Sequence, residues 1–168
     1  INVVTDPQVN AWCMAGGKMV VYTGLLDTIK PTDDELAQVL GHEISHALAN
    51  HSAERMSVAV ISSAGLGALG AVTDSELSMT AAAVAAKYAL ELPNSRSGES
   101  EADEIGIELA AKAGFNPDAA VSLWRKMGAL GGNSTPEFMS THPSPDTRQE
   151  DLRRLANKDR PYYLKSKG

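Results

Sequence analysis

The sequence predicts an α+β fold that is predominantly helical, with a small antiparallel sheet packed on one central helix. Two β-branched runs lie within the first 23 residues, as expected for a few short strands. Capped segments with helical periodicity fill most of the remaining chain. Only 5% of the residues are aromatic. The core must therefore depend on small and aliphatic side chains, which suit close packing between helices.

Length and composition limit the class of protein. The 168 residues, 43% of them hydrophobic, suit a single globular catalytic or binding domain spanning 1–168. The formal net charge is −6 and no long basic run occurs, so nucleic-acid binding is not expected. A lone cysteine, Cys13, excludes an internal disulfide and a thiolate zinc site. The chain begins at Ile1 rather than Met, and we expect an excised or processed domain whose N-terminal targeting segment is missing.

Two short strands are expected near the start, at 1–4 (Ile-Asn-Val-Val) and 18–23 (Lys-Met-Val-Val-Tyr-Thr). Turn residues separate them, which favours an antiparallel pair whose connecting loop at 10–15 folds back onto the core. A sheet edge can hold a peptide as an added strand. We therefore expect a peptide-binding cleft to be lined by Met19, Val20, Val21 and Tyr22; the other interpretation is a plain core strand, and the two roles are compatible.

The central helix is expected to run from Asp33 to Arg55. Thr32 and Glu35 form a capping box at its start. Apolar residues follow at helical spacing over the next four turns.

This helix contains the sequence His-Glu-Ile-Ser-His at 42–46. His42 and His46 lie one turn apart on the same face, where two imidazoles can bind one zinc ion. Glu43 lies between them, where its carboxylate can act as a general base on a water molecule. His51 is nine residues beyond His42, on about the opposite side of the helix, and is not expected to bind the same ion.

A third zinc ligand is expected from a helix at 99–113. One face of that helix is a charged, solvent-exposed stripe of Glu101, Glu104, Glu108 and Lys112. Glu99 and Asp103 lie on another face, which is otherwise made of Gly and Ala, and buried charges need a partner or a metal. Glu99 is therefore predicted as the third ligand. Asp103 is expected to accept the free N–H of a ligand histidine; the alternative is that both are half-exposed acids.

Other segments are expected to complete the helical wall. Helices are predicted at 76–91, after Asn116-Pro117, and at 145–157, with loops at 128–136 and 140–143. The most apolar run, 58–72, is shorter than the ~20 apolar residues of a spanning helix. We expect a buried helix or hairpin there, with contact to a membrane surface as the lesser alternative.

These motifs together resemble the HtpX-like and CAAX-prenyl-protease family of zinc metallopeptidases, which are compact gluzincins with a zincin-like fold. The matching segments follow in family order over nearly the whole chain, at 10–11, 16–26, 42–46, 95–103 and 141–143 (Thr-His-Pro). The resemblance implies a zinc endopeptidase with one zinc ion per chain and Glu99, not Glu101, as the third ligand. It is closest in kind to soluble bacterial members, which implies a place in or near the cell envelope, in the periplasm or associated with the membrane.

The predicted mechanism follows from this set of residues. Zinc held by His42, His46 and Glu99 would activate a water molecule, and Glu43 would take its proton and pass it to the leaving amine. An oxyanion then needs a donor, for which His142 and Arg148 are the candidates. His142 could instead occupy the open zinc position and hold the enzyme latent, and the sequence leaves both alternatives open.

Two function classes compete. The leading hypothesis is a zinc-dependent endopeptidase that hydrolyses misfolded or envelope-associated polypeptides. The alternative is a chaperone-like binding module in which zinc only stabilises the fold, with His142 as a permanent fourth ligand, because structural zinc sites are closed by four protein ligands. Glu43 favours the enzyme, since a structural site needs no base.

Overall fold

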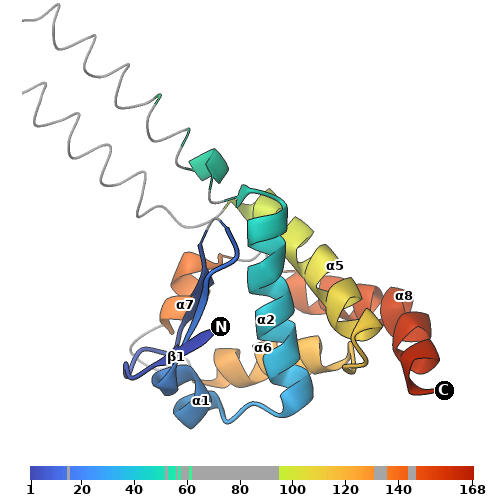
Figure 1. Ribbon diagram of the computed structural model, residues 1–168. Coiled ribbons are helices and arrows are strands. Elements are labelled where there is room, and N and C mark those ends of the chain that lie inside the picture. Colours follow the sequence, from blue (N-terminus) through green and yellow to red (C-terminus); the bar gives the residue numbers. More distant parts are fainter. Residues whose placement is uncertain are drawn as a thin grey trace, which may run out of the picture.

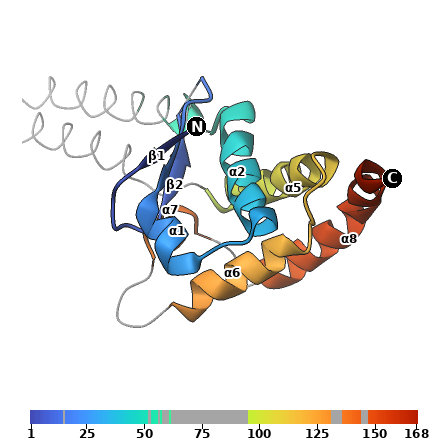
Figure 2. The same cartoon turned by 60° about the horizontal axis from the view of Figure 1, so that its bottom comes forward.

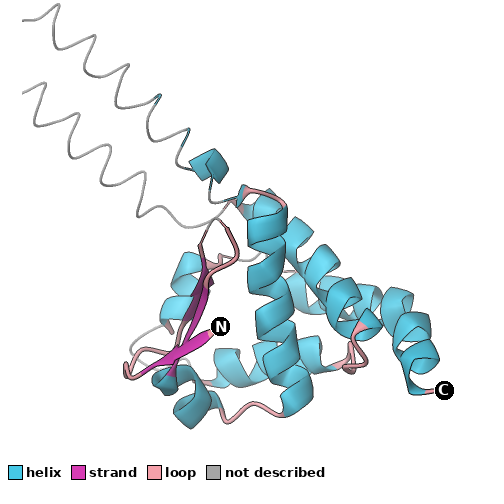
Figure 3. Ribbon diagram, viewed as in Figure 1, coloured by secondary structure: helices cyan, strands magenta, loops and turns pink. Residues whose placement is uncertain are grey.

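Helices dominate the structure, as predicted, and a small sheet lies at one side of them (Figures 1 and 3). The computed structural model describes residues 1–14, 16–51, 53–55, 57, 61, 95–130, 136–143 and 147–168. The predicted helix at 76–91 and most of the apolar run at 58–72 lie outside these residues. Among the described residues, no helix combines the length and hydrophobicity that crossing a bilayer requires.

The sheet is mixed, so the prediction of an antiparallel sheet is wrong. Strand β1 (Asn2–Val4) pairs in parallel with β3 (Met19–Tyr22), and β2 (Ala11–Cys13) pairs antiparallel with the other side of β3. The expected loop contains the third strand, so the chain reverses twice between β1 and β3. Gly16 and Gly17, both at positive φ, make the second reversal. Two reversals restore the original direction, which makes the β1–β3 pair parallel.

Two short helices were not predicted. Helix α1 (Thr23–Ile29) follows β3 directly, and α7 (Glu137–Thr141) begins after the loop expected at 128–136 and overlaps the start of the loop expected at 140–143. Each is at most two turns long, too short for periodicity to distinguish it from a loop. Helix α7 is attached to the strand region by the N–H of Phe138, which donates to the carbonyl of Val9 at 3.1 Å.

The central helix α2 (Asp33–Leu48) begins as predicted and ends earlier. Thr32 Oγ1 accepts the N–H of Glu35, and Glu35 Oε2 accepts the N–H of Thr32 at 2.9 Å, so the capping box is confirmed. The helix was expected to continue to Arg55. It ends at Leu48 because Asn50 takes a left-handed conformation with φ of 58°, which Asn tolerates better than most residues.

Helix α5 (Arg96–Lys112) lies along α2 in very close contact, with α2 between it and the sheet (Figure 1). The approach is possible because Gly41 and Gly106 face each other. A Cβ built on Gly106 would lie 2.8 Å from the backbone nitrogen of His42, which is closer than real Cβ contacts. This backbone contact lies beside the His-Glu-x-x-His motif, so it sets the distance between the motif and the helix that carries Glu99.

Replacing Gly106 with Ala is expected to destabilise the fold. The added methyl group meets the backbone of α2, which cannot move aside as a side chain would, and overpacking of this kind costs about 1–3 kcal/mol. Denaturant unfolding would measure the loss. Gly128→Ala is the matched control, because Gly128 also lies in a helix and a Cβ added there would meet no described atom within 4 Å. That control is expected to be neutral or slightly stabilising.

The remaining helices close the core. Helix α6 (Ala119–Ala129) packs against α2, and α8 (Arg148–Lys167) packs mainly against α5, contacts α6 and extends beyond it toward the C-terminus (Figure 2). A helix was expected to begin at Asn116-Pro117. Asn116 Oδ1 instead accepts the N–H of Asp118 in a turn, and α6 begins at Ala119. Helix α8 extends well beyond the predicted end at 157. The buried core joins Leu25, Val39, Leu123, Trp124, Met127, Phe138, Leu152 and Leu155.

Candidate metal centre and catalytic cleft

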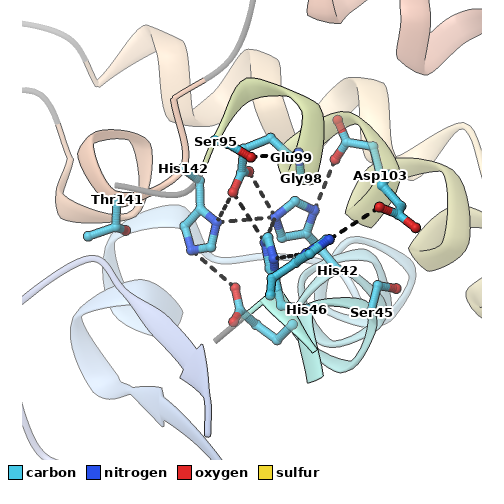
Figure 4. A network of polar contacts seen from close by, with 12 residues as sticks. His42, Ser45, His46, Ser95, Gly98, Glu99, Asp103, Thr141 and His142 are labelled. Atoms are coloured by element: carbon cyan, nitrogen blue, oxygen red, sulfur yellow. Dashed lines mark hydrogen bonds and ion pairs between the residues drawn. The ribbon is translucent and has the colours of Figure 1, made fainter. Parts of the chain in front are cut away.

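His42 and His46 point from α2 toward one buried position (Figure 4). Their Nε2 atoms lie 3.0 Å apart, and both residues are at most 5% exposed. The helical spacing explains this, because residues four apart lie one above the other. Two imidazoles facing each other in this way direct two nitrogen atoms at the same point.

Glu99 from α5 reaches the same position. Its Oε2 lies 3.2 Å from His42 Nε2 and its Oε1 lies 3.2 Å from His46 Nε2. The residue is fully buried. Ser95 caps α5 with its side chain and begins the helix one turn before Glu99, so the carboxylate projects from the first full turn toward α2.

His142 is the fourth donor at this position and follows α7. Its Nδ1 lies 3.0 Å from Glu99 Oε1 and 3.2 Å from His42 Nε2. The donor atoms of His42, His46, Glu99 and His142 all lie within 4.8 Å of one another. Phe138 stacks on the ring of His142 with centroids 4.4 Å apart, which fixes its orientation.

The donor set fits a bound cation. Burying three imidazoles and a carboxylate is costly unless a proton or a metal ion joins them. Among the described residues, Glu99 Oε2 accepts no hydrogen bond that meets geometric criteria. Histidine nitrogens and a carboxylate oxygen in a compact buried group are the ligands that zinc prefers when cysteine is absent.

Burial and mutual contacts shift the pKa values of the cluster. Burial would raise the pKa of Glu99, but close contacts with the imidazoles of His142, His42 and His46 hold it far below its usual range. Burial lowers the pKa of His142 to about 4. For His42, contacts with Asp103 and Glu99 outweigh burial and raise the pKa to about 9. The Glu99 carboxylate therefore stays ionised and supplies negative charge within the cluster.

Asp103 and Arg148 contact the side chains of His42 and Glu99. Asp103 Oδ1 lies 3.0 Å from His42 Nδ1 and accepts a hydrogen bond from Arg148 Nη2 at 2.6 Å. Arg148 also places Nη1 3.5 Å from Glu99 Oε2 and stacks on the ring of Trp124 at 3.5 Å. The buried guanidinium thus bridges two carboxylates of α5. Trp124 was not singled out from the sequence, where it has only the signature of a core residue.

Glu43 lies on the other side of the cluster, next to a cleft. Its Oε1 is 3.3 Å from His142 Nε2, and the backbone N–H of Cys13 donates to its carboxylate. Burial raises the pKa of Glu43 to about 8. A cavity of about 210 Å³ opens here, lined by residues 10–13 of the strand region together with Glu43, His46 and His142.

The model of peptidase family M48 matches residues 1–156. The chain belongs to peptidase family M48.

Individual M48 relatives agree with this assignment. The chain is 41% identical to the mitochondrial metalloendopeptidase OMA1 of Arabidopsis thaliana over 90% of its own length and 30% of that protein. It is 33% identical to the metalloprotease YcaL of Escherichia coli, over 90% of the chain and 60% of YcaL. It is 31% identical to the β-barrel assembly-enhancing protease of E. coli, over 97% and 35% respectively. The chain thus spans roughly a third to three fifths of the length of these relatives.

Membership of M48 confirms the predicted class, a zinc metalloprotease. Zinc is the metal on which M48 peptidases depend, and the structure positions the cluster of His42, His46, Glu99 and His142 for such an ion. The resemblance stated from the sequence is confirmed at the level of this family. The relatives include both mitochondrial and bacterial proteins.

One expectation about the cleft of this M48 chain needs correction. Met19 to Tyr22 were expected to offer a sheet edge, but the strand order is β1-β3-β2, so β3 is central. Its backbone is paired on both sides, and Met19 and Val21 are buried in the core. The strand next to Glu43 is β2, whose Trp12 pairs with Val20 of β3. The sequence did not predict β2, because three residues are too few to show a clear alternation of apolar and polar side chains.

His51 has a place beside the cluster that the sequence did not predict. It was expected to point away from the ion, and it contributes no atom to the four-donor group. Its Nδ1 nevertheless lies 2.9 Å from His46 Nδ1. The prediction assumed one straight helix to Arg55. Because α2 ends at Leu48, His51 is not on the opposite side of that helix and lies next to His46. Asn50 was the available signal, since Asn near a helix end favours a left-handed turn.

Proposed function

We propose that this chain is the catalytic domain of a zinc-dependent endopeptidase that cleaves misfolded or envelope-associated proteins. The observation that supports it most strongly is the buried group of His42, His46 and Glu99 with Glu43 between that group and a cleft. His42, His46 and Glu99 would hold the ion. When bound, zinc would supply a Lewis acid that makes a water molecule more acidic and polarises the scissile carbonyl.

Glu43 is proposed as the general base. Its carboxylate would take a proton from the attacking water and deliver it to the nitrogen of the leaving amine. The N–H of Cys13 holds the carboxylate in place, and burial brings its pKa toward the neutral range, where a base works efficiently. A carboxylate with an ordinary pKa would accept the proton less readily.

Asp103 and Arg148 are proposed to position the ligands. Asp103 would accept the Nδ1–H of His42, which leaves Nε2 free to bind the ion. Arg148 donates to Asp103 and lies beside Glu99, behind the cluster. The geometry therefore favours a role in orienting two carboxylates over the oxyanion contact considered from the sequence.

The substrate is proposed to bind along β2. Ala11 and Cys13 belong to a strand that is paired with β3 on one side and lines the cleft beside Glu43. An extended peptide can add to such an edge through main-chain hydrogen bonds, which suits a protease that accepts many sequences. Unfolded polypeptide segments can present an extended backbone to this edge, so they are the expected substrates.

The names of the relatives support this substrate class. Two are called mitochondrial metalloendopeptidase and β-barrel assembly-enhancing protease. By analogy we propose a protein of the bacterial cell envelope, in the periplasm or peripherally associated with the membrane, that acts in protein quality control.

Cleavage of an unfolded protein tests the proposed activity. The zinc-loaded protein is expected to degrade reduced casein into fragments whose new termini, read by mass spectrometry, lie within the casein chain. Native, compact proteins are expected to resist. Release of single residues from chain ends would contradict an endopeptidase, and absence of any cleavage with zinc bound, in both the wild type and a His142→Ala variant, would favour the binding module.

The position of His142 points to a second state of the metal site. Its Nδ1 lies among the ligand atoms, so four protein donors are available, as in a structural zinc site. Its Nε2 also faces Glu43 at 3.3 Å, which places the ring between the ion site and the base. We propose that this arrangement is a latent state, in which His142 blocks the position that water needs.

His142→Ala is expected to raise peptidase activity several-fold and to leave zinc bound. The reason is that the variant removes the blocking imidazole but keeps His42, His46 and Glu99. Steady-state cleavage of a fluorogenic peptide, with zinc content measured on the same sample, provides the comparison. Lower activity with zinc retained would assign His142 to the oxyanion instead, and loss of zinc would indicate a permanent structural ligand.

A further inference from the structure

His51 is held against His46 by the backbone at the end of α2. The helix stops at Leu48, and the left-handed Asn50 turns the chain so that the imidazole of His51 returns beneath the last helical turn. The residue is only 7% exposed. Its Nδ1 lies 2.9 Å from His46 Nδ1, and the two rings are nearly edge-on, with centroids 5.0 Å apart.

The position of His51 also depends on α5. Gly98 lies in the first turn of that helix, next to Glu99, and a Cβ built there would lie 3.5 Å from His51 Cε1. The imidazole therefore packs directly on the turn that carries the third ligand. His51 therefore contacts both helices of the metal site, His46 on α2 and Glu101 on α5.

The contact between the two imidazoles has only one productive proton arrangement. The Nε2 of His46 faces His42 and Glu99 and must keep its lone pair if it is to bind an ion. A neutral His46 then carries its proton on Nδ1 and donates it to His51 Nδ1. His51 in turn carries its proton on Nε2, which lies 3.3 Å from Glu101 Oε2.

We infer that His51, assisted by Glu101, is a positioning residue that fixes the ring and the tautomer of His46. It does for His46 what the Asp103 carboxylate does for His42. The inference rests on the proposed zinc site. Glu101 was expected on a solvated stripe, and its side chain is 58% exposed, so its share is smaller than that of His51. Partners of this kind typically change metal affinity or activity by about 10–100-fold.

A pair of isosteric variants isolates the hydrogen bond. His51→Asn and His51→Leu remove the ring and leave side chains of similar shape, but only Asn offers an oxygen that can accept the Nδ1–H of His46. Zinc affinity, measured by competition with a chromophoric chelator, is expected to fall about 10–100-fold in the Leu variant. The Asn variant is expected to recover most of that loss. Glu104→Gln, an exposed change on the same helix, is the control and is expected to bind zinc like the wild type.

Cobalt substitution supplies a readout that a purely structural role would not move. The visible absorption of bound Co²⁺ reports ligand geometry, and we expect the Leu variant to alter it while the Asn variant keeps the wild-type spectrum. Should the Leu variant not fold, as judged by circular dichroism, the Asn spectrum carries the test, and a changed spectrum overturns the inference. Equal zinc affinities in the Leu and Asn variants also overturn it. A wild-type protein without zinc affinity would instead refute the proposed zinc site itself.

Discussion

Glu43→Gln is expected to reduce peptide cleavage by about 10²–10⁴-fold or more, the range of general-base catalysis, with zinc content unchanged. The amide keeps the size of the side chain but cannot take a proton from water. Glu43 contributes no atom to the four-donor group, so its replacement leaves the ligands in place. Cleavage rates and zinc content should be measured on the same preparation.

The controls for this variant concern charge and pH. Glu54→Gln removes a carboxylate from an exposed position near the same motif and is expected to retain full activity. Because burial raises the pKa of Glu43, the base form is lost at a higher pH than for an ordinary glutamate as the solution is acidified. The acid limb of kcat/KM should accordingly lie above the usual carboxyl range. An active, zinc-loaded Glu43→Gln protein would refute the proposed role.

Glu99→Ala is expected to have the second largest effect, the loss of bound zinc together with activity. Glu99 contacts His42, His46 and His142 at 3.0–3.2 Å, so its removal deprives three imidazoles of the carboxylate that they share. We expect zinc affinity to fall by more than about 10²-fold, because even partners outside the ligand set change affinity 10–100-fold.

Matched variants on the same helix distinguish this effect from general damage to α5. Glu104→Ala removes an exposed carboxylate that pairs with Lys158 and is expected to keep both zinc and activity. Folding of the zinc-free proteins should be compared by circular dichroism. If Glu99→Ala bound zinc as tightly as Glu104→Ala, Glu99 would not be the third ligand.

The helical part of the site could be predicted from the sequence because helix periodicity fixes which side chains share a face. His42 with His46, and Glu99 with Asp103, each lie one turn apart, and a face of Gly and Ala marked the second pair as buried. The structure brings all four side chains together. The contact of α2 with α5 through Gly106 is what joins the two faces.

Features that depend on loops or on long-range contacts could not be predicted in the same way. His142 lies 100 residues from His42 and reaches the cluster through α7, a five-residue helix with no periodic signal. The mixed sheet depends on the three-residue strand β2, whose existence is decided by pairing with β3 rather than by local propensity. His51 turned inward because one residue, Asn50, left the helical conformation.

The most direct test of the proposed function is a zinc titration of casein cleavage. The protein would be stripped with a chelator, then reloaded stepwise, with bound zinc and cleavage rate measured on each sample. We expect activity to be absent without zinc and to rise in proportion to bound metal up to one ion per chain. Activity that persists in the stripped protein, or zinc that binds at one ion per chain in the wild type and in His142→Ala without producing any cleavage, would contradict a zinc-dependent endopeptidase.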